Sequence, residues 1–391
     1  MTGLFFKRAL LPSGWAGDVR VTIADGRFAT VTPDAAPEPG DDRHAVAFPG
    51  LANVHSHAFQ RGMAALAETA GLNDDDFWSW RETMYRFVLT LNPDQIEAIA
   101  AYAFAEMLEG GFTTVGEFHY LHHNLDGSPY ANRAELAERV AAAAGEAGIG
   151  LTLLPVFYAH GNFGDAPPSP RQARFLNNLD GFSTLLEGCR RAVSGLEGAR
   201  VGVAPHSLRA ASAAEVKAIA AMAPDGPIHI HAAEQTKEVE DCEAATGLRP
   251  VEFLIERIGL DTRWCLIHAT HLTAGETRKL AASGAVAGLC PVTESNLGDG
   301  IFPTFDYLNG GGRFGVGTDS NILISAADEL KTIEYIQRLK YRARNVLAPK
   351  GGSTGRRLFD GALAGGAQAL GLGAVGLAPG ARADLVTLQA D

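Results

Sequence analysis

The sequence predicts an α/β protein in which a (β/α)8 TIM-type barrel carries a small β-domain formed by the N- and C-terminal segments. From about residue 46 onward, short apolar runs that end at polar or glycine-rich turns alternate with stretches of helical periodicity. There are eight such runs, the number of strands that closes this type of barrel. Both termini lie outside this repeat and have the patterning of short strands.

The eight predicted strands should be parallel, because strands that alternate with helices return to the same edge of a sheet before each new strand begins. Helical stretches such as 93–110, 133–148 and 213–223 separate them and close near Gly or Pro. The strands are expected to end near Val54, Glu117, Tyr158, His206, His231, His268, Pro291 and Asp319.

Three segments are expected along the chain. Residues 1–46 form a small β element, in which DVRVTIADGRFATVTP alternates in polarity and Asp25-Gly26 supplies a hairpin turn. Residues 47–370 form the barrel. Residues 371–391 contain turns and one strand that returns to the small β element.

Composition narrows the class of protein and its partners. Of 391 residues, 46% are hydrophobic and 20% are charged, as expected of a globular chain with a large core. A net charge of -12 without any basic run disfavours nucleic acid and anionic membranes as partners. We therefore expect a small-molecule substrate, and a homodimer remains open.

The N-terminus and the cysteines indicate the compartment. The opening MTGLFFKRALLPSGW lacks both the basic region and the small-residue cleavage site of a signal peptide, and no segment is long and apolar enough to span a bilayer. The four cysteines are far apart and form no Cys-x-x-Cys pair. We expect a cytoplasmic protein without a thiolate metal site.

Histidine and aspartate residues at strand ends predict a metal site. The loops that follow the strands of a barrel all open on one face, so residues at the strand ends converge there. His55 and His57 end the first predicted strand, His231 the fifth and Asp319 the eighth. Imidazole and carboxylate ligands suit one divalent ion, with Zn²⁺ preferred and Fe²⁺ as the alternative.

Other histidines are assigned to structural positions. A single buried histidine is more often a satisfied core residue than a ligand, so His44 and His160 are not included in the metal site. His229 shares strand parity with His231 but lies one layer deeper. His231 is the expected ligand, because it is nearer the strand end and is followed by Glu234.

Three residues are candidates for proton transfer. Glu234 follows His231 as His-x-x-Glu and is expected just beyond the metal. His268 ends the sixth strand, where it could stabilise developing charge, whereas His271 is expected at the surface or among the residues that surround the ligands. Asp319 could both bind the ion and accept a proton from bound water, whose pKa a metal lowers toward about 7.

The end of the fourth strand bears on the number of metal ions. Many barrel hydrolases bridge two ions with a modified lysine at this place, but VAPHSLR has no lysine nearby. A single ion is therefore expected, which favours deamination over two-metal amide hydrolysis.

Four motifs, FPGLANVHSHAFQRG, HIHAAEQ, WCLIHATHL and GVGTDSN, resemble those of the amidohydrolase superfamily in its single-metal deaminase branch. They occur in the expected order between residues 48 and 321. Within that branch, NVHSHAFQRGMAAL, FWSWRETMYR and EFHYLHHN are most similar to the formimidoylglutamate deiminases of histidine degradation. These enzymes hydrolyse N-formimino-L-glutamate to N-formyl-L-glutamate and ammonia.

The resemblance implies zinc ligands and proton-transfer groups at the positions given above, and it adds substrate contacts. A dicarboxylate that approaches an acidic protein needs local positive charge, and arginine can bind a carboxylate in a bidentate manner. The implied contacts of the glutamate moiety are Gln60, Arg81, Tyr120, His206 and Arg209.

Alternative functions stay open at this point. Another deaminase of the branch would act on a guanine-like or other ring amidine and would want apolar stacking walls more than paired arginines. Imidazolonepropionase uses a similar metal site on a monocarboxylate. A third alternative is not an enzyme: the chain could be a protein that binds metal without turning over a substrate.

The C-terminus departs from the family pattern. Family members usually continue beyond ADLVTL, so the small β-domain is expected to be short or truncated.

Overall fold

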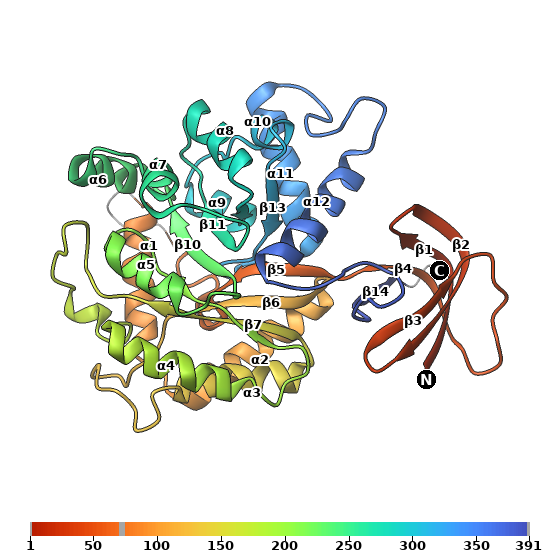
Figure 1. Ribbon diagram of the computed structural model, residues 1–391, viewed down its shortest axis with the longest axis horizontal. Coiled ribbons are helices and arrows are strands. Elements are labelled where there is room, and N and C mark those ends of the chain that lie inside the picture. The colour runs from red at the N-terminus through yellow and green to blue at the C-terminus, as the bar shows by residue number, and fades with distance from the viewer. Residues whose placement is uncertain (1, 70–74, 389–391) are drawn as a thin grey trace.

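The computed structural model describes residues 2–69 and 75–388 and divides them into a barrel and a small sheet (Figure 1). The barrel sheet has the order β10-β11-β12-β13-β5-β6-β7-β8, and β9 also pairs with β7. Its strands are β5 (Leu51–Ser56), β6 (Phe112–His119), β7 (Gly150–Phe157), β8 (Arg200–Val201), β9 (Ala204–Pro205), β10 (Ile228–Ala232), β11 (Trp264–His268), β12 (Val286–Leu289) and β13 (Arg313–Val316).

Every paired strand of this sheet is parallel to its neighbour, as the alternation of strands and helices predicts. Parallel bridges from Val203 to Ile228 and from Ser207 to His231 join the fourth strand to β10. These bridges link the two ends of the strand order, so the sheet curls into the predicted TIM-type barrel.

The fourth strand differs from its prediction, because it is split into β8 and β9 around Gly202. A Cβ atom at Gly202 would lie 2.4 Å from the carbonyl oxygen of Pro227 and 2.7 Å from a methyl group of Leu154. The backbone at Pro227, just before β10, therefore approaches the fourth strand too closely for a side chain at Gly202.

Helices surround the barrel, and several of them begin at a capping side chain. Asn92 caps α2 and forms a capping box with Gln95, while Thr273 and Glu276 do the same for α8. The helices are α1 (Phe77–Val88), α2 (Pro93–Glu109), α3 (Glu135–Ala147), α4 (Leu179–Ala192), α5 (Ala213–Ala221), α6 (Thr236–Thr246), α7 (Pro250–Phe253), α8 (Ala274–Ser283), α9 (Pro291–Leu297), α10 (Thr304–Asn309), α11 (Ala326–Tyr341) and α12 (Thr354–Ala369). Short 3-10 turns lie at Ala58–Met63 and Pro170–Gln172, and a π-helical turn at Leu254–Ile258.

The small sheet lies to one side of the barrel, and both chain ends reach it (Figure 1). Its order is β14-β4-β1-β2-β3, and the C-terminal strand β14 pairs antiparallel with β4. Asp25 and Gly26 join β2 to β3 with left-handed φ angles of 50° and 67°, as a two-residue hairpin turn requires. The strands are β1 (Thr2–Leu11), β2 (Gly14–Ala24), β3 (Arg27–Thr32), β4 (Asp42–Pro49) and β14 (Leu385–Leu388).

Separate hydrophobic clusters hold the small sheet and the barrel. The small sheet packs residues such as Phe6, Val19 and Phe28 against Leu377 from the C-terminal segment. The barrel has its own large core between strands and helices. In the described part of the chain, no helix combines the length and the apolar character that crossing a bilayer needs.

Candidate active site

Strained backbone gathers where the barrel strands end. Ala233, His268, Ala269, Asp319 and Asn321 have φ angles between 48° and 66°, a left-handed region that residues other than glycine seldom occupy. They follow or end β10, β11 and β13. Such strain persists only where the surroundings hold it, and it concentrates at functional sites.

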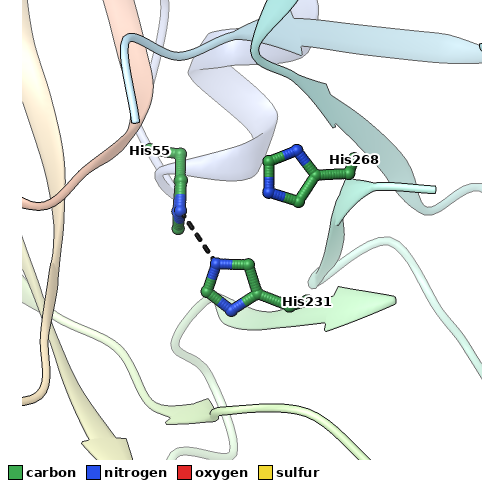
Figure 2. Close-up of side chains that lie close together, drawn as sticks. All are labelled: His55, His231 and His268. Carbon is green, nitrogen blue, oxygen red and sulfur yellow. Dashed lines mark hydrogen bonds between the residues drawn. The ribbon is translucent and has the colours of Figure 1, made fainter. Parts of the chain in front are cut away.

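The four predicted metal ligands lie together at this face. Asp319 Oδ1 is 3.5 Å from His55 Nε2 and 3.4 Å from His57 Nε2. The Nε2 atoms of His55 and His231 are 3.1 Å apart. Figure 2 shows His55, His231 and His268 around one small space, and these side chains offer ligand atoms within 4.8 Å of one another.

The chemistry of this donor set fits a divalent cation. The carbonyl oxygens of Phe118 and His206 accept hydrogen bonds from Nδ1 of His57 and His231, each at 3.1 Å, so Nδ1 of both rings carries the proton. Their Nε2 lone pairs then point into the site. Burial lowers the pKa of His55 to about 3 and also lowers the pKa of His57 and His231, which keeps the imidazoles neutral as metal ligation requires.

Main-chain hydrogen bonds fix the carboxylate against the first two histidines. His57 N donates to Asp319 O at 3.0 Å, and Asp319 N donates to His55 O at 2.9 Å. Burial alone would raise the pKa of Asp319, but the hydrogen bond with His55 and the neighbouring imidazoles outweigh it and hold this pKa below its usual range. Asp319 is thus an ionised carboxylate.

The three candidate proton-transfer groups lie beside the ligands. His268 Nε2 is 3.7 Å from Glu234 Oε1 and 3.7 Å from Asp319 Oδ2, and its Nδ1 is 3.3 Å from Glu294 Oε1. Burial would lower the pKa of His268, but these carboxylates outweigh it and raise the pKa to about 10. Burial raises the pKa of Glu234 to about 7, close to the range in which a carboxyl group can both take up and release a proton.

A cavity opens above this cluster, with about 600 Å³ of space between its walls, part of it open to solvent. Glu234, His231 and Asp319 lie at its metal side. Aromatic side chains form much of the rest of its lining. All five predicted substrate contacts line it: Gln60, Arg81, Tyr120, His206 and Arg209.

Two arginines in the cavity wall retain hydrogen-bonding capacity. Nε of Arg81 and Nε of Arg209 are buried and have no hydrogen-bond partner among the described residues. The guanidinium group of Arg81 stacks on Trp78, 4.4 Å from the ring centre. Gln60 Nε2 donates to the hydroxyl of Tyr120 at 2.9 Å, which fixes two polar groups in the cavity lining.

Comparison with known proteins assigns the chain to a family. Residues 46–391 match the model described as the amidohydrolase family, and residues 1–45 match the N-terminal domain of the formimidoylglutamate deiminase HutF. The chain belongs to the amidohydrolase family.

Among its relatives in this family is a formimidoylglutamate deiminase from Pseudomonas aeruginosa, 51% identical over all of this chain and 86% of that protein. An 8-oxoguanine deaminase from the same organism is 30% identical over 89% of this chain and 75% of its own length. A crystal structure of an amidohydrolase from Brucella melitensis covers 99% of this chain, with 86% of that chain covered, 55% identity and a TM-score of 0.97. The predicted family and fold class are confirmed.

The histidines assigned to structural positions lie outside the metal cluster. His229 Nε2 donates to the carbonyl oxygen of Ala369 at 2.7 Å, one layer below His231. His160 Nε2 pairs with Glu215 at 2.8 Å, and His44 stacks on Phe6 in the small sheet.

Sequence reasoning missed the residues that support the ligands. Asn53 Nδ2 donates to Thr318 Oγ1 at 2.7 Å, and Asn321 Nδ2 donates to Ser56 Oγ at 3.1 Å, so side chains also join β5 to the end of β13. Thr318 and Asn321 belong to the GTDSN motif, so the sequence contained a signal for them.

A buried glutamate supports the other side of His57. Glu117 Oε1 accepts a hydrogen bond from Ala58 N at 2.7 Å, directly after His57, and burial raises the pKa of Glu117 to about 8. Spacing along the chain gives no hint of this contact, because it depends on the pairing of β5 with β6.

Proposed function

We propose that the chain hydrolyses N-formimino-L-glutamate to N-formyl-L-glutamate and ammonia, with one divalent ion at the candidate metal site. As a member of the amidohydrolase family it is a hydrolase, and its 51% identical relative carries this activity in its name. The observation that carries the proposal is one cavity lined both by His57, His231 and Asp319 of the His/Asp cluster and by Arg81 and Arg209. In a linear amidine with two carboxylates, the amidine group suits the His/Asp cluster and the carboxylates suit the two arginines.

The proposed ligands are His55, His57, His231 and Asp319, and zinc is the proposed metal, with ferrous iron compatible with the same donors. When bound, such an ion lowers the pKa of water and polarises the reacting carbon-nitrogen group. The protein holds the ligands in place before the substrate arrives.

The protein's own groups move the protons. In the proposed reaction, the oxygen of a water molecule attacks the formimino carbon while Asp319 accepts the water proton. Glu234 gives a proton to the imino nitrogen, which becomes an amino group on a carbon that carries a hydroxyl group. The proton held by Asp319 then passes to this amino nitrogen, Glu234 takes the hydroxyl proton, and the carbon-nitrogen bond breaks, so that ammonia leaves and the carbon keeps the oxygen as a formyl group. His268, whose pKa the neighbouring carboxylates raise, stabilises negative charge that develops on this oxygen.

The wall holds the glutamate moiety. Arg81 and Arg209 each offer a planar set of N–H donors for a carboxylate, and Gln60, Tyr120 and His206 add single polar contacts. Carboxylates fixed in this way would bring the formimino carbon close to Asp319 and Glu234, which converts binding energy into orientation.

We extend the proposal to organisation and location. The small β element at 1–46 and the segment 371–391 would form one unit beside a catalytic unit at 47–370. The four cysteines are buried and free, which suits a reducing cytoplasm. Assembly as a homodimer is compatible with this proposal.

A second candidate is a deaminase of ring amidines. The aromatic side chains of Phe77, Trp80 and Tyr85 line the cavity and could stack on a purine, and the 8-oxoguanine deaminase relative supports this alternative. A purine leaves both arginines without carboxylates, so this candidate ranks below the first.

Turnover of chemically defined substrates tests the proposal. Purified protein with measured zinc content is mixed with N-formimino-L-glutamate, and ammonia and the mass of the organic product are followed. We expect ammonia and N-formylglutamate in equal amounts. Parallel assays use 8-oxoguanine, guanine and imidazolonepropionate. Turnover of one of these alone, or none by folded metal-loaded protein, would overturn the substrate assignment.

A further inference from the structure

A buried carboxylate lies directly behind the candidate proton donor. Glu238 is in the first turn of α6, is 1% exposed and does not line the substrate cavity. Its Oε1 accepts a hydrogen bond from Ala233 N at 3.1 Å, and its Oε2 accepts one from Glu234 N at 3.3 Å. One side chain therefore receives the two consecutive N–H groups that bring the chain from β10 to Glu234.

These two hydrogen bonds hold an unusual backbone. Ala233 has a φ angle of 51°, in the left-handed region, and is fully buried, and Glu234 is 6% exposed. Left-handed residues turn successive N–H groups toward the same side, where they attract an anion. Without an acceptor these N–H groups would be buried and unsatisfied, which is costly, so the carboxylate keeps the turn in place.

The same carboxylate faces the candidate substrate arginine. Arg209 Nη2 is 3.8 Å from Glu238 Oε2 and 3.8 Å from Glu234 Oε2, so the guanidinium group lies between the two glutamates. Burial would lower the pKa of Arg209, but Glu238 and Glu234 outweigh it and raise that pKa. Glu238 is therefore in contact with both the turn and the arginine.

We propose that Glu238 is a positioning residue that locks Glu234 and Arg209 into one arrangement, so that the proton donor and the carboxylate-binding group are set together. This inference rests on the proposed function, because it assigns Glu234 and Arg209 the roles given there. Glu238 does not touch the substrate. Its influence passes through the Ala233–Glu234 backbone to kcat and through the Arg209 guanidinium group to KM.

The variant Glu238→Gln tests this role with the smallest change in volume. The amide retains one acceptor oxygen, but its NH2 group faces either an N–H donor or the arginine. Glu238→Asp serves as a second variant, because it keeps the charge and withdraws the carboxylate from both amides. Either variant should shift the turn, and a misplacement of about 1 Å at a reacting group can cost on the order of 100-fold in rate.

Glu334 provides a matched control. It is 3% exposed, accepts hydrogen bonds from Val346 N at 2.9 Å and Leu347 N at 3.0 Å, and pairs with Arg338 at 2.7 Å. It lies on α11 and does not line the cavity. Glu334→Gln thus removes the same kind of contacts at a place remote from the chemistry, so it should lower stability and leave kcat and KM unchanged.

The experiment measures kcat and KM for N-formimino-L-glutamate, metal content, and hydrogen exchange of the Ala233 and Glu234 amides in metal-loaded protein. For Glu238→Gln we expect a 10- to 100-fold fall in kcat, a several-fold rise in KM, unchanged metal content and faster exchange of both amides. In a Glu234→Gln background, the same change should lower kcat less than twofold, because its route to proton transfer is already removed.

Kinetic constants within twofold of the parent, with exchange of these amides unchanged, would overturn the inference. A fall in kcat of the same size in the Glu234→Gln background would also overturn it, because Glu238 would then act by another route. If the parent protein fails to turn over N-formimino-L-glutamate, the proposed function fails, and the amide exchange of Glu238→Gln and Glu238→Asp still decides whether Glu238 holds the turn. If Glu238→Gln does not fold, Glu238→Asp gives the same readouts.

Discussion

The two sides of the cavity are built differently. On the metal side, His55, His231 and Asp319 come from the ends of three barrel strands, and main-chain hydrogen bonds tie β5 directly to Asp319. On the substrate side, Arg81 comes from α1 and Arg209 from the turn after β9, and neither is fixed by a backbone ladder. The metal side is thus preset by the barrel, while the position of Arg81 depends on how α1 packs against the barrel.

The substrate wall depends on a different kind of anchor. Arg174 is fully buried, and its guanidinium group donates to the main-chain oxygens of Val88 and Leu91 at the end of α1 and of His123 after β6. A cation at the C-terminal end of a helix also interacts favourably with the helix dipole. One side chain thus holds the helix that carries Arg81. We therefore expect that mutation of a metal ligand impairs metal binding, whereas mutation of a cavity arginine impairs substrate binding and leaves the metal bound.

The largest expected effect is on the metal side. His231→Ala removes one nitrogen donor from the buried cluster of candidate ligands. We expect loss of bound metal and a fall in activity of more than about 1,000-fold, since no group then activates water. Metal analysis by mass spectrometry and an ammonia assay check both. Full metal content with normal turnover would contradict the assignment of this ligand.

The next largest effect separates proton transfer from metal binding. Glu234→Gln keeps the shape of the side chain but cannot donate the proton, so kcat should fall about 100- to 10,000-fold. Metal content should stay at that of the parent, because Glu234 is not among the proposed ligands. A variant that loses its metal would show that the two functions are not separable at this residue.

Changes in the substrate wall should be smaller and should spare the metal. Arg81→Met and Arg209→Met each remove one carboxylate partner, and a charged hydrogen-bonded pair contributes about 2–3 kcal/mol, or about 100-fold in kcat/KM. The fall in kcat/KM should come mainly from a higher KM for N-formimino-L-glutamate. Steady-state kinetics measure it, and a loss limited to kcat would place the arginine in another role.

The smallest effect concerns stability on the metal side. The pKa of Glu117 is raised to about 8 by burial, so its contribution to stability is fully present below the unfolded-state pKa and is lost as pH rises through the folded-state pKa. Between pH 6 and 7.5 this group should lower the free energy of unfolding by about 2 kcal/mol. Glu117→Gln should remove that decline.

Urea unfolding of zinc-saturated parent and variant at both pH values measures this difference. A decline of the same size in Glu117→Gln would assign the pH dependence to other groups.

The same contrast explains what could be predicted from the sequence. His-x-His at one strand end and Asp at another can be recognised because the barrel brings strand ends together wherever they lie in the chain. The structure does bring His55, His57, His231 and Asp319 together, and all five predicted wall residues line the cavity. The wall residues could be named only through resemblance to a family.

The supporting residues could not be predicted in this way. Glu117 and Glu238 act on backbone amides in neighbouring segments, and these contacts depend on strand register and on the angle at which α6 leaves β10. The split of the fourth strand at Gly202 depends on the approach of Pro227 from the next strand. The spacing of residues along the sequence gives none of these distances, so these contacts can be seen only in the folded structure.

The claim that the arginines bind the carboxylates of the substrate can be tested with the parent protein, without any mutation. The measurement compares kcat/KM of the zinc-loaded parent for N-formimino-L-glutamate and for an analogue of the same length that lacks one carboxylate. We predict at least about 100-fold lower kcat/KM for the analogue, because one arginine would be buried without its partner. Equal kcat/KM for the two compounds would contradict the claim that the arginine wall recognises a dicarboxylate.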